Sequence, residues 1–335
     1  METLYFLGID VAKKSFQAAL TIDGINFYSA EVENSPSAIK SFFNGLKREV
    51  GFSFIQLRVC MEHTGIYGYP LLDFLVKTSI DVCVEPALQI KQSQGMTRGK
   101  TDQIDAKRIA LYAFKNQGQL RFWRPQRQII QKIKALLVLR DRLIKIKSQL
   151  EVPLTEMSTF VETGIRLEVS KGCGKTRKAL ALDIENVECQ IDTLILTDER
   201  VKTQLRYARS VPGVGKITAL HMIVETGEFE QITEAKKFAC YAGVAPFEHS
   251  SGSSIRGKTR VSKMANMTIK KLLHLGAMSS IQCCDEIKVY YRRKVDVGKN
   301  KMSVINAVRN KLISRVFACV QQQRMYEKIY QHEFA

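Results

Sequence analysis

The first part of the chain alternates between short apolar runs and amphipathic stretches. The apolar runs have the length of β-strands and cover residues 5–10, 15–22, 25–32, 54–61 and 82–84. The other stretches place apolar residues three and four apart, as in a helix, over residues 36–46, 69–77 and 102–113. Ser35 and Pro36 suit the start of the first helix, because serine is a good N-cap and proline fits the first helical position. A meander of three strands followed by alternating helices and strands predicts a mixed α/β sheet.

Residues 126–205 follow a different pattern, in which leucine and isoleucine recur every three or four positions between lysine and arginine. One run covers residues 128–150 and a second covers residues 180–205, with Gly172-Cys173-Gly174 between them. We predict a helical, coiled-coil-like connector whose two helices form an antiparallel hairpin. The hairpin would serve either as a dimerisation arm or as a linker packed on one domain.

Residues 206–335 are predicted to form a mainly α-helical domain. The segment 211–219 reads as a tight turn entering a helix, and it is similar to the hairpin of helix-hairpin-helix DNA-binding proteins. A helix ends near residue 242, residues 249–258 read as a polar loop rich in serine and glycine, and an apolar helix follows near residue 270. The sequence thus predicts three domains, residues 1–125, 126–205 and 206–335.

The charge is strongly basic and unevenly placed. The 335 residues hold 51 Lys and Arg against 33 Asp and Glu, a net charge of +18. Residues 206–335 hold 22 of the basic residues and 10 of the acidic ones, which is a net charge of +12. Such a concentration favours a polyanionic partner, because each phosphate that is neutralised releases counterions.

The apolar runs and the cysteines narrow the class of protein further. No apolar run approaches the roughly 20 residues that span a bilayer, so we expect no membrane segment. The eight cysteines form no C-x-x-C pair, which argues against a zinc site or a disulfide framework. We therefore expect a cytoplasmic protein with reduced thiols.

Four acids stand where predicted strands end and a predicted helix begins. Asp10 ends the first strand, Glu62 follows the fourth, and Asp102 and Asp105 lie three apart at the start of a helix. If the first and fourth strands are neighbours, Asp10 and Glu62 emerge at the same sheet edge, and the i, i+3 spacing puts the other two acids on one helix face. Clustered carboxylates suit Mg²⁺ or Mn²⁺, which can activate and orient an oxygen at a phosphodiester.

Each acid also has a purely structural explanation. Asp102 would serve as an N-cap, and Asp105 as a first-turn acid favoured by the helix dipole. Glu85 also ends a strand and competes with Glu62 for the same role. The order of a strand ending in Asp, a strand ending in Glu and an Asp-x-x-Asp helix is more specific than any one of its parts.

Three segments carry a resemblance to a known family. They are Gly8-Ile9-Asp10-Val11-Ala12-Lys13, Met61-Glu62-His63-Thr64-Gly65-Ile66-Tyr67 and Lys100-Thr101-Asp102-Gln103-Ile104-Asp105-Ala106. With them the chain resembles, over nearly its whole length, the bacterial insertion-sequence transposases with an Asp-Glu-Asp-Asp tetrad. That family includes the Piv-type DNA invertases, and its better-studied members are bridge-RNA-guided serine recombinases. The resemblance implies a RuvC-like N-terminal domain, meaning the RNase H fold, with Asp10, Glu62, Asp102 and Asp105 as a metal-binding tetrad.

The C-terminal signature of the same family is similar to Gly243-Val244-Ala245-Pro246, Ser251-Gly252 and Val261-Ser262-Lys263. In that signature the serine before glycine is the nucleophile, which matches Ser251, although Ser250 and Ser253 are close enough to compete. Ala265 departs from the pattern, since many members have glycine there, and this affects only the local turn. His249 is too close in sequence to be a good base for Ser251. A metal held by the tetrad would instead polarise the phosphate or activate the serine.

Nucleic-acid contacts are expected from backbone amides at the tight turn and from basic residues around the polar loop and the helix after it. The predicted nucleic-acid-binding residues are Gly213, Gly215, Lys216, Arg256, Lys258, Arg260, Lys263, Lys270 and Lys271.

The resemblance implies a transposase that cuts and rejoins DNA through a phosphoserine intermediate. Its partners would be the element ends, the target DNA and a guide RNA, the last implied by the resemblance alone. Recombination holds several DNA strands together, so we expect a dimer or tetramer associated with the bacterial nucleoid. Two alternatives stay open: a junction-resolving nuclease that uses the tetrad and water, and a non-enzymatic nucleic-acid binder, against which the intact tetrad argues.

Overall fold

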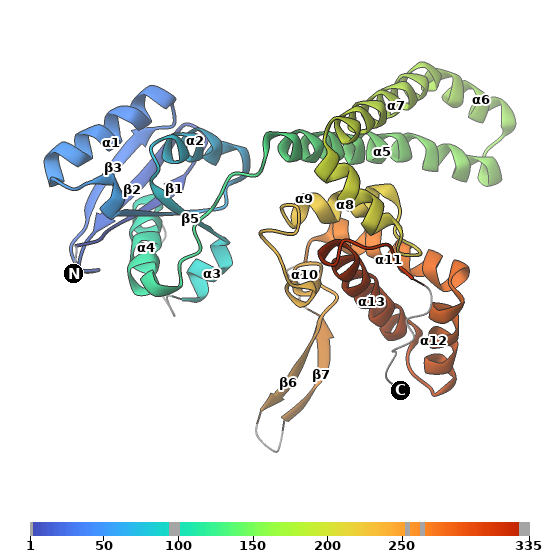
Figure 1. The fold of residues 1–335 in the computed structure, drawn as a ribbon. Helices are drawn as coiled ribbons and strands as arrows, with labels where there is room; N and C mark the ends of the chain where they lie inside the picture. The colour runs from blue at the N-terminus through green and yellow to red at the C-terminus, as the bar shows by residue number, and fades with distance from the viewer. Residues whose placement is uncertain (1–2, 94–100, 252–254, 262–264, 328–335) are drawn as a thin grey trace. The chain divides into compact units, whose positions relative to one another are not determined.

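The structure is a computed structural model, and it describes residues 3–93, 101–251, 255–261 and 265–327. The chain divides into two compact units, Met1–Pro125 and Gln126–Ala335 (Figure 1). Residue 205, where we divide the connector from the C-terminal domain, lies inside helix α8 (Glu199–Arg209). In the part of the chain that is described, no helix is long and apolar enough to cross a membrane.

The first unit is built on a five-stranded sheet with the order β3-β2-β1-β4-β5. Its strands are β1 (Tyr5–Val11), β2 (Ser15–Thr21), β3 (Tyr28–Glu33), β4 (Leu57–Glu62) and β5 (Asp81–Glu85). Strands β1, β2 and β3 form an antiparallel meander, and β4 and β5 run parallel to β1. The predicted mixed α/β sheet is confirmed, with an antiparallel meander followed by parallel strands.

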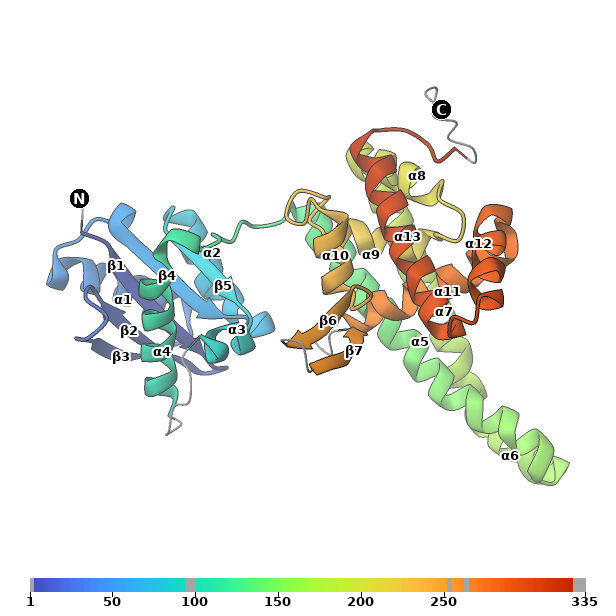
Figure 2. The same cartoon turned by 90° about the horizontal axis from the view of Figure 1, so that it is seen from below.

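Helices cover both faces of this sheet. On one face, α1 (Pro36–Val50) and α2 (Tyr69–Lys77) pack on a core that includes Leu7, Ile9 and Val59. On the other face lies α4 (Asp102–Lys115), as Figures 1 and 2 show. The predicted start of α1 is confirmed, because the Ser35 side chain accepts a hydrogen bond from the backbone N–H of Ala38.

Three details of the first unit differ from the sequence prediction. Residues 54–56 form a short 3₁₀ turn, η1 (Phe54–Gln56), instead of the start of a strand. The third strand begins three residues later than predicted, because the Asp23 carboxylate accepts hydrogen bonds from the backbone N–H groups of Ile25 and Asn26 and holds them in a turn. A short helix, α3 (Ala87–Gln92), precedes α4 and was not predicted. Two further 3₁₀ turns are η2 (Gly65–Gly68) and η3 (Gln117–Gln119).

Helix α4 approaches the sheet most closely at Gly8. A Cβ atom added to Gly8 would lie 2.1 Å from the backbone nitrogen of Ala110 and 2.3 Å from the carbonyl oxygen of Ala106. Both atoms belong to the backbone and cannot turn away as a flexible side chain would. Only glycine therefore allows α4 to rest on β1 at this depth.

The second unit is mainly helical, as predicted. Its helices are α5 (Gln128–Phe160), α6 (Thr163–Gly172), α7 (Gly174–Thr197), α8, α9 (Lys216–Glu225), α10 (Ala235–Tyr241), α11 (Met267–Cys283), α12 (Asp285–Asp296) and α13 (Lys301–Gln321). Helices α5 and α7 pack side by side as an antiparallel arm that extends from the other helices (Figures 1 and 2). The predicted hairpin is therefore present, but a third helix, α6, forms its tip because α5 already ends at Phe160.

The predicted polar loop at residues 249–258 is wrong. Strands β6 (Pro246–Ser251) and β7 (Ile255–Val261) form an antiparallel β-hairpin that projects beyond α10 in Figure 1. The serine and glycine content suggested an unstructured loop, because these residues favour turns. The segment Ile255–Val261 that follows instead pairs with β6.

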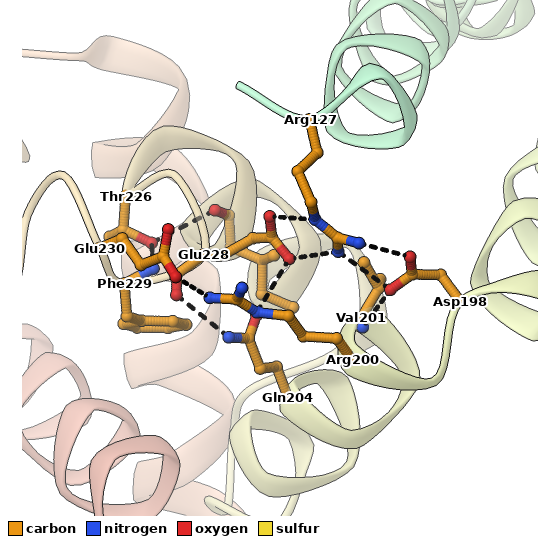
Figure 3. Close-up of polar contacts among 10 residues, drawn as sticks. Arg127, Asp198, Arg200, Val201, Gln204, Thr226, Glu228, Phe229 and Glu230 are labelled. Carbon is orange, nitrogen blue, oxygen red and sulfur yellow. Dashed lines mark hydrogen bonds and ion pairs between the residues drawn. The ribbon is translucent and has the colours of Figure 1, made fainter. Parts of the chain in front are cut away.

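A cluster of ion pairs around the buried Glu228 fixes the start of the arm to the rest of the second unit (Figure 3). The Arg127 side chain donates to Glu228 Oε2 at 2.8 Å and to Asp198 Oδ2 at 2.7 Å. Arg200 also pairs with Glu228, whose side chain is only 4% exposed. The bonds to Glu228 and Asp198 raise the pKa of Arg127, and the Arg127 guanidinium in turn lowers the pKa of Asp198. One arginine thus joins the start of α5, the N-cap of α8 and the loop after α9.

Replacing Gly8 by alanine tests the close packing of α4. We expect Gly8→Ala to reduce the free energy of unfolding by at least about 2 kcal/mol, because the added carbon overlaps the α4 backbone. Gly45→Ala is the matched control, since Gly45 lies within α1 with no heavy atom within 4 Å of the added Cβ. The control should be neutral or about 0.5–1 kcal/mol more stable. Chemical denaturation of the full chain measures both, and equal stability of Gly8→Ala and the unchanged protein would contradict the packing.

Replacing Arg127 tests the cluster in Figure 3. Arg127→Met keeps the apolar part of the side chain but leaves the buried Glu228 with one cation fewer, so we expect a loss of about 1–3 kcal/mol. Lys134→Met on the exposed side of α5 removes the same charge and should change stability by less than about 0.5 kcal/mol. Thermal unfolding of the two variants gives the comparison, and the same melting temperature in both would show that the cluster adds nothing.

Candidate catalytic site

Every second residue of β1 faces helix α4. Gly8 lies against the α4 backbone, and the ring of Phe6 packs edge-on against Phe114, with ring centroids 5.5 Å apart. Side chains alternate between the two faces of a strand, so Asp10 shares the face of Phe6 and Gly8. Asp10 therefore lies on the α4 side of the sheet, near the C-terminal end of β1.

Glu62 lies beside Asp10 on the neighbouring strand. Strands β1 and β4 are parallel, and their register pairs Ile9 with Met61, so Asp10 and Glu62 are the next residues in line. Cys60 packs in the cluster beneath α4, which places Glu62, two residues later, on the same face. Neighbouring strands lie about 4.8 Å apart, so the two acids start from adjacent points of the backbone.

Helix α4 brings Asp102 and Asp105 to the same end of the sheet. The C-terminal end of the helix packs on the start of β1 and its middle lies over Gly8, so α4 runs antiparallel to β1. From Gly8 to Asp10 the strand advances about 6.6 Å, which corresponds to about four residues of helix. Asp10 is therefore level with the first turn of α4, which contains Asp102 and Asp105.

Thr101, and not Asp102, caps the N-terminus of α4. Its side chain accepts a hydrogen bond from the backbone N–H of Ile104 at 3.3 Å, while Asp102 is the exposed first residue of the helix. The capping explanation of Asp102 is therefore wrong. Asp105 is half-buried, and its carboxylate accepts a hydrogen bond from Arg108 Nη1 at 2.9 Å. Both acids also lie where the helix dipole favours negative charge.

Glu85, the competitor of Glu62, lies one strand further from Asp10. It is opposite Glu62 in the register of β4 and β5, and it is only 9% exposed. Its Oε1 accepts a hydrogen bond from the thiol of Cys83 at 3.3 Å. Two strand spacings put its backbone about 10 Å from that of Asp10. The register thus favours Glu62 as the glutamate next to Asp10.

The four acids share one end of the sheet without converging on a single point. Within residues 3–93, 101–251, 255–261 and 265–327, no three His, Cys, Asp or Glu side chains lie close enough together to hold one metal ion. The chemistry of the donors nevertheless suits Mg²⁺ or Mn²⁺, because all four are carboxylates at one place in the fold. In the arrangement described, Arg108 balances part of this charge through Asp105.

In the core beneath α4, the pKa values of Cys60 and Tyr112 are raised, so both groups stay neutral. The pKa of the Cys60 thiol is raised by its contact with Cys83 and by burial, and also by the negative charges of Glu85 and Glu62. Burial likewise raises the pKa of Tyr112 in the same cluster. Cys60 therefore stays a neutral thiol.

Ser251 is the last residue of β6 in the hairpin of the second unit. In the backbone register it pairs with Ile255, and Ser250 pairs with Arg256. Three basic residues follow in the sequence of β7. They are Arg256, Lys258 and Arg260.

Side-chain amides that the sequence prediction did not include hold both ends of this hairpin. Before β6, Asn306 of α13 donates a hydrogen bond to the carbonyl oxygen of Val244 at 2.7 Å. After β7, Asn266 caps α11 through the backbone N–H of Ile269 and donates to the Tyr241 hydroxyl at 2.8 Å. Asn306 interrupts an apolar helical pattern, which is the one signal that could have identified it.

Helix α11 carries Lys270 and Lys271 just after the hairpin. Lys271 is exposed and Lys270 is half-buried, and neither forms an ion pair with another described residue. The buried Arg309 fixes α11 to α13, with its Nη2 atom 2.6 Å from His274 Nδ1. Lys263, which we also expect to bind nucleic acid, lies outside the described residues.

The predicted helix-hairpin-helix-like element is formed by α8, α9 and the turn between them. Gly213 in this turn has a φ of +89°, and an added Cβ would lie 2.4 Å from the carbonyl oxygen of Gly276 in α11. Gly213 therefore serves close packing. Gly215 is the exposed N-cap of α9, and the Lys216 ammonium pairs with Asp192 at 2.5 Å.

Comparisons with known proteins match both parts of the chain that carry candidate residues. Residues 7–157 match the transposase family DEDD_Tnp_IS110, and residues 205–292 match the family described as Transposase IS116/IS110/IS902. The pilin gene-inverting protein of Moraxella bovis is 25% identical over 331 residues, which cover 96% of this chain and 98% of that protein. The transposase for insertion sequence element IS1111A of Coxiella burnetii is 24% identical, and the match covers 68% of each chain.

A search of solved structures finds T. thermophilus RuvC in complex with a Holliday junction substrate. That match covers 36% of this chain and 99% of the RuvC chain, with 13% sequence identity and a TM-score of 0.27.

Glutamine substitutions on the two neighbouring strands test the assignment of Glu62. We expect Glu62→Gln to weaken Mn²⁺ binding about tenfold or more, because it removes a charged ligand next to Asp10. Glu85→Gln makes the same chemical change one strand away and should leave Mn²⁺ affinity within about twofold. Loss of the free Mn²⁺ signal in electron paramagnetic resonance measures both on the full chain. A larger effect of Glu85→Gln would show that Glu85 is the ligand.

Proposed function

Because the chain belongs to the transposase family of the IS110-type insertion sequences, we propose that it is a DNA recombinase that cuts and rejoins DNA with two catalytic parts. The first part is the tetrad Asp10, Glu62, Asp102 and Asp105, and the second is Ser251. The observation that carries the proposal is the register of β1 and β4, which aligns Asp10 with Glu62 below the first turn of α4.

The tetrad is proposed to hold divalent metal, Mg²⁺ or Mn²⁺. Such an ion would supply Lewis-acid stabilisation of the negative charge that develops on the transferred phosphate. Asp10 and Glu62 extend from paired strands, which gives them fixed starting points. Asp102 and Asp105 lie in the first turn of α4.

Ser251 is proposed as the nucleophile. A bond forms between its Oγ and the phosphorus of a DNA phosphodiester, one P–O ester bond of the strand breaks, and the released DNA oxygen takes up the proton that the serine loses. The ester is exchanged and not hydrolysed, so attack by another DNA hydroxyl can rejoin a strand without ATP. The position of Ser251 at the end of β6, followed in sequence by glycine, supports close approach of a phosphate.

The second unit is proposed to supply most of the contacts to nucleic-acid phosphates. Residues 206–335 carry the +12 excess of charge, and Lys270 and Lys271 lie on α11 directly after the hairpin. Arg256, Lys258 and Arg260 on β7 and the N-terminus of α9 at Gly215 and Lys216 extend this basic set. A guide RNA rests on the family resemblance, and the basic charge suits RNA as well as DNA.

Assembly into a dimer or tetramer also stays a proposal, and the tip of the arm supports it. None of the residues of α6 is buried, although the helix includes Ile165 and Leu167. Phe160, at the end of α5, is 86% exposed. Apolar residues gathered at one exposed place are typical of an interaction surface.

A metal-dependent junction nuclease that uses activated water is the alternative function. The alignment of the acids supports it equally, because that reaction needs the tetrad and not Ser251. The two functions differ in their product: the recombinase leaves DNA attached to the protein, whereas the nuclease leaves two free ends.

Substitution of the serine separates the two functions. We expect Ser251→Ala to bind DNA normally but to cleave it at least about 10³-fold more slowly, with no covalent protein–DNA complex, because the nucleophile is absent. Ser250→Ala is the matched control and should keep most of the activity. The assay incubates the full chain with DNA carrying candidate element ends, candidate guide RNA and Mg²⁺, and resolves cut strands and protein-linked strands on denaturing gels.

Two other outcomes have definite meanings in that assay. Cleavage by Ser251→Ala at the same position would support the water-activating nuclease. Loss of activity in Ser250→Ala alone would move the nucleophile by one residue and leave the recombinase proposal in place.

A further inference from the structure

A groove lies on the second unit where α7, α8 and the turn before α9 meet. Its volume is about 580 Å³, within the range of pockets that hold small organic ligands. One wall is apolar and is formed by Ile195, Leu196, Leu205 and Met325. Leu196 is 71% exposed, which is high for a leucine beside a buried core.

The rim of the groove is basic because of the periodicity of α8. Lys202, Arg206 and Arg209 are spaced by four and three residues, so they form one row along the helix. The opposite row, which includes Val201 and Ala208, is buried in the core. Lys216, at the start of α9, adds a fourth cation to the rim.

Two of these four cations have no ion-pair partner among the described residues. Lys202 pairs with Glu199, and Lys216 pairs with Asp192, the one acid among the groove-lining residues. Arg206 and Arg209 form no ion pair with any other residue that the structure describes. The groove thus combines two guanidinium groups with an apolar wall.

We propose that this groove binds one nucleotide of an unpaired nucleic-acid strand, with its phosphate on Arg206 and Arg209 and its base against Leu196 and Met325. The proposal rests on the proposed function, which makes nucleic acid the partner. It adds where on the second unit a nucleotide binds, and that the bound strand is unpaired. A simple inorganic anion would use the guanidinium groups but leave the apolar wall uncovered. A base in a duplex is stacked and paired, so only an unpaired base can turn its face to such a wall.

The location agrees with this role. Ser210 and Lys216, at the two ends of the turn between α8 and α9, both line the groove. The groove is therefore continuous with Gly215 and the N-terminus of α9, where we place contacts to phosphate. The unpaired strand would be either RNA or a displaced DNA strand, since both present a phosphate next to a base.

Paired substitutions with equal loss of charge test the groove. Arg206→Gln/Arg209→Gln removes its two guanidinium groups, and Arg292→Gln/Arg293→Gln removes two exposed charges from α12 as the control. Fluorescence anisotropy of a labelled DNA strand, an RNA strand of the same sequence and the corresponding DNA duplex gives affinity at several salt concentrations. We expect the groove variant to bind an unpaired strand about 10–100-fold more weakly, with a salt slope lower by about 1.4 for two lost contacts.

Leu196→Asp tests the apolar wall separately. Because Leu196 is largely exposed, this variant should fold normally while weakening binding of the unpaired strand by about tenfold. Thermal unfolding of all variants checks that they remain folded. If the groove variants lose more affinity for the RNA strand than for the DNA strand, the occupant is RNA. If they lose more affinity for the unpaired DNA strand, the occupant is a displaced DNA strand.

Three results would overturn the proposal. The groove variant could bind unpaired strands as the α12 control does. It could lose the same affinity for duplex as for unpaired strands, which would make α8 a general basic face without a nucleotide site. Leu196→Asp could bind as the unchanged protein does. In each case, cleavage by the unchanged protein would leave the proposed recombinase function in place, whereas a protein that neither binds nor cleaves nucleic acid would contradict both.

Discussion

The contact between β1 and α4 at Gly8 is the constraint on which the candidate metal site depends. Because no side chain separates Gly8 from Ala106 and Ala110, the helix lies directly on the strand. Its antiparallel direction then brings the first turn of α4 to the end of the strand that carries Asp10. Parallel pairing adds Glu62 at the same level. Strand β1, strand β4 and the first turn of α4 thus place four acids at one end of the sheet.

In the second unit, side-chain hydrogen bonds hold the β6–β7 hairpin at both of its ends. Hydrogen bonds from Asn306 to Val244 and from Asn266 to Tyr241 fix the two ends of the hairpin to helices. Arg127 ties the long arm to the same helical core through Glu228 and Asp198. The ends of the hairpin are therefore anchored in a packed core, while Ser251 lies at the far end of β6.

Much of the fold could be predicted because local patterns and tertiary packing agree. The strands around Asp10 and Glu62 are apolar and short, and the cap at Ser35 has its expected partner. The hairpin was missed because serine and glycine suggest a loop, whereas the pairing of β6 with β7 is a long-range property. The ion pairs of Arg127 and the Asn306 contact join residues 62 or more positions apart, so no local pattern reveals them. Sequence spacing placed Asp102 near the helix start but could not show that Thr101 is the cap.

The central claim is that strand cleavage passes through a covalent bond to Ser251 assisted by the tetrad. The most direct measurement is mass spectrometry of the protein recovered from a cleavage reaction with Mg²⁺, after nuclease digestion of the DNA and proteolysis of the chain. The account predicts a nucleotide mass on one peptide, with fragmentation that localises it to Ser251. Cut DNA with free ends, together with no nucleotide on any peptide, would contradict the account and favour attack by water.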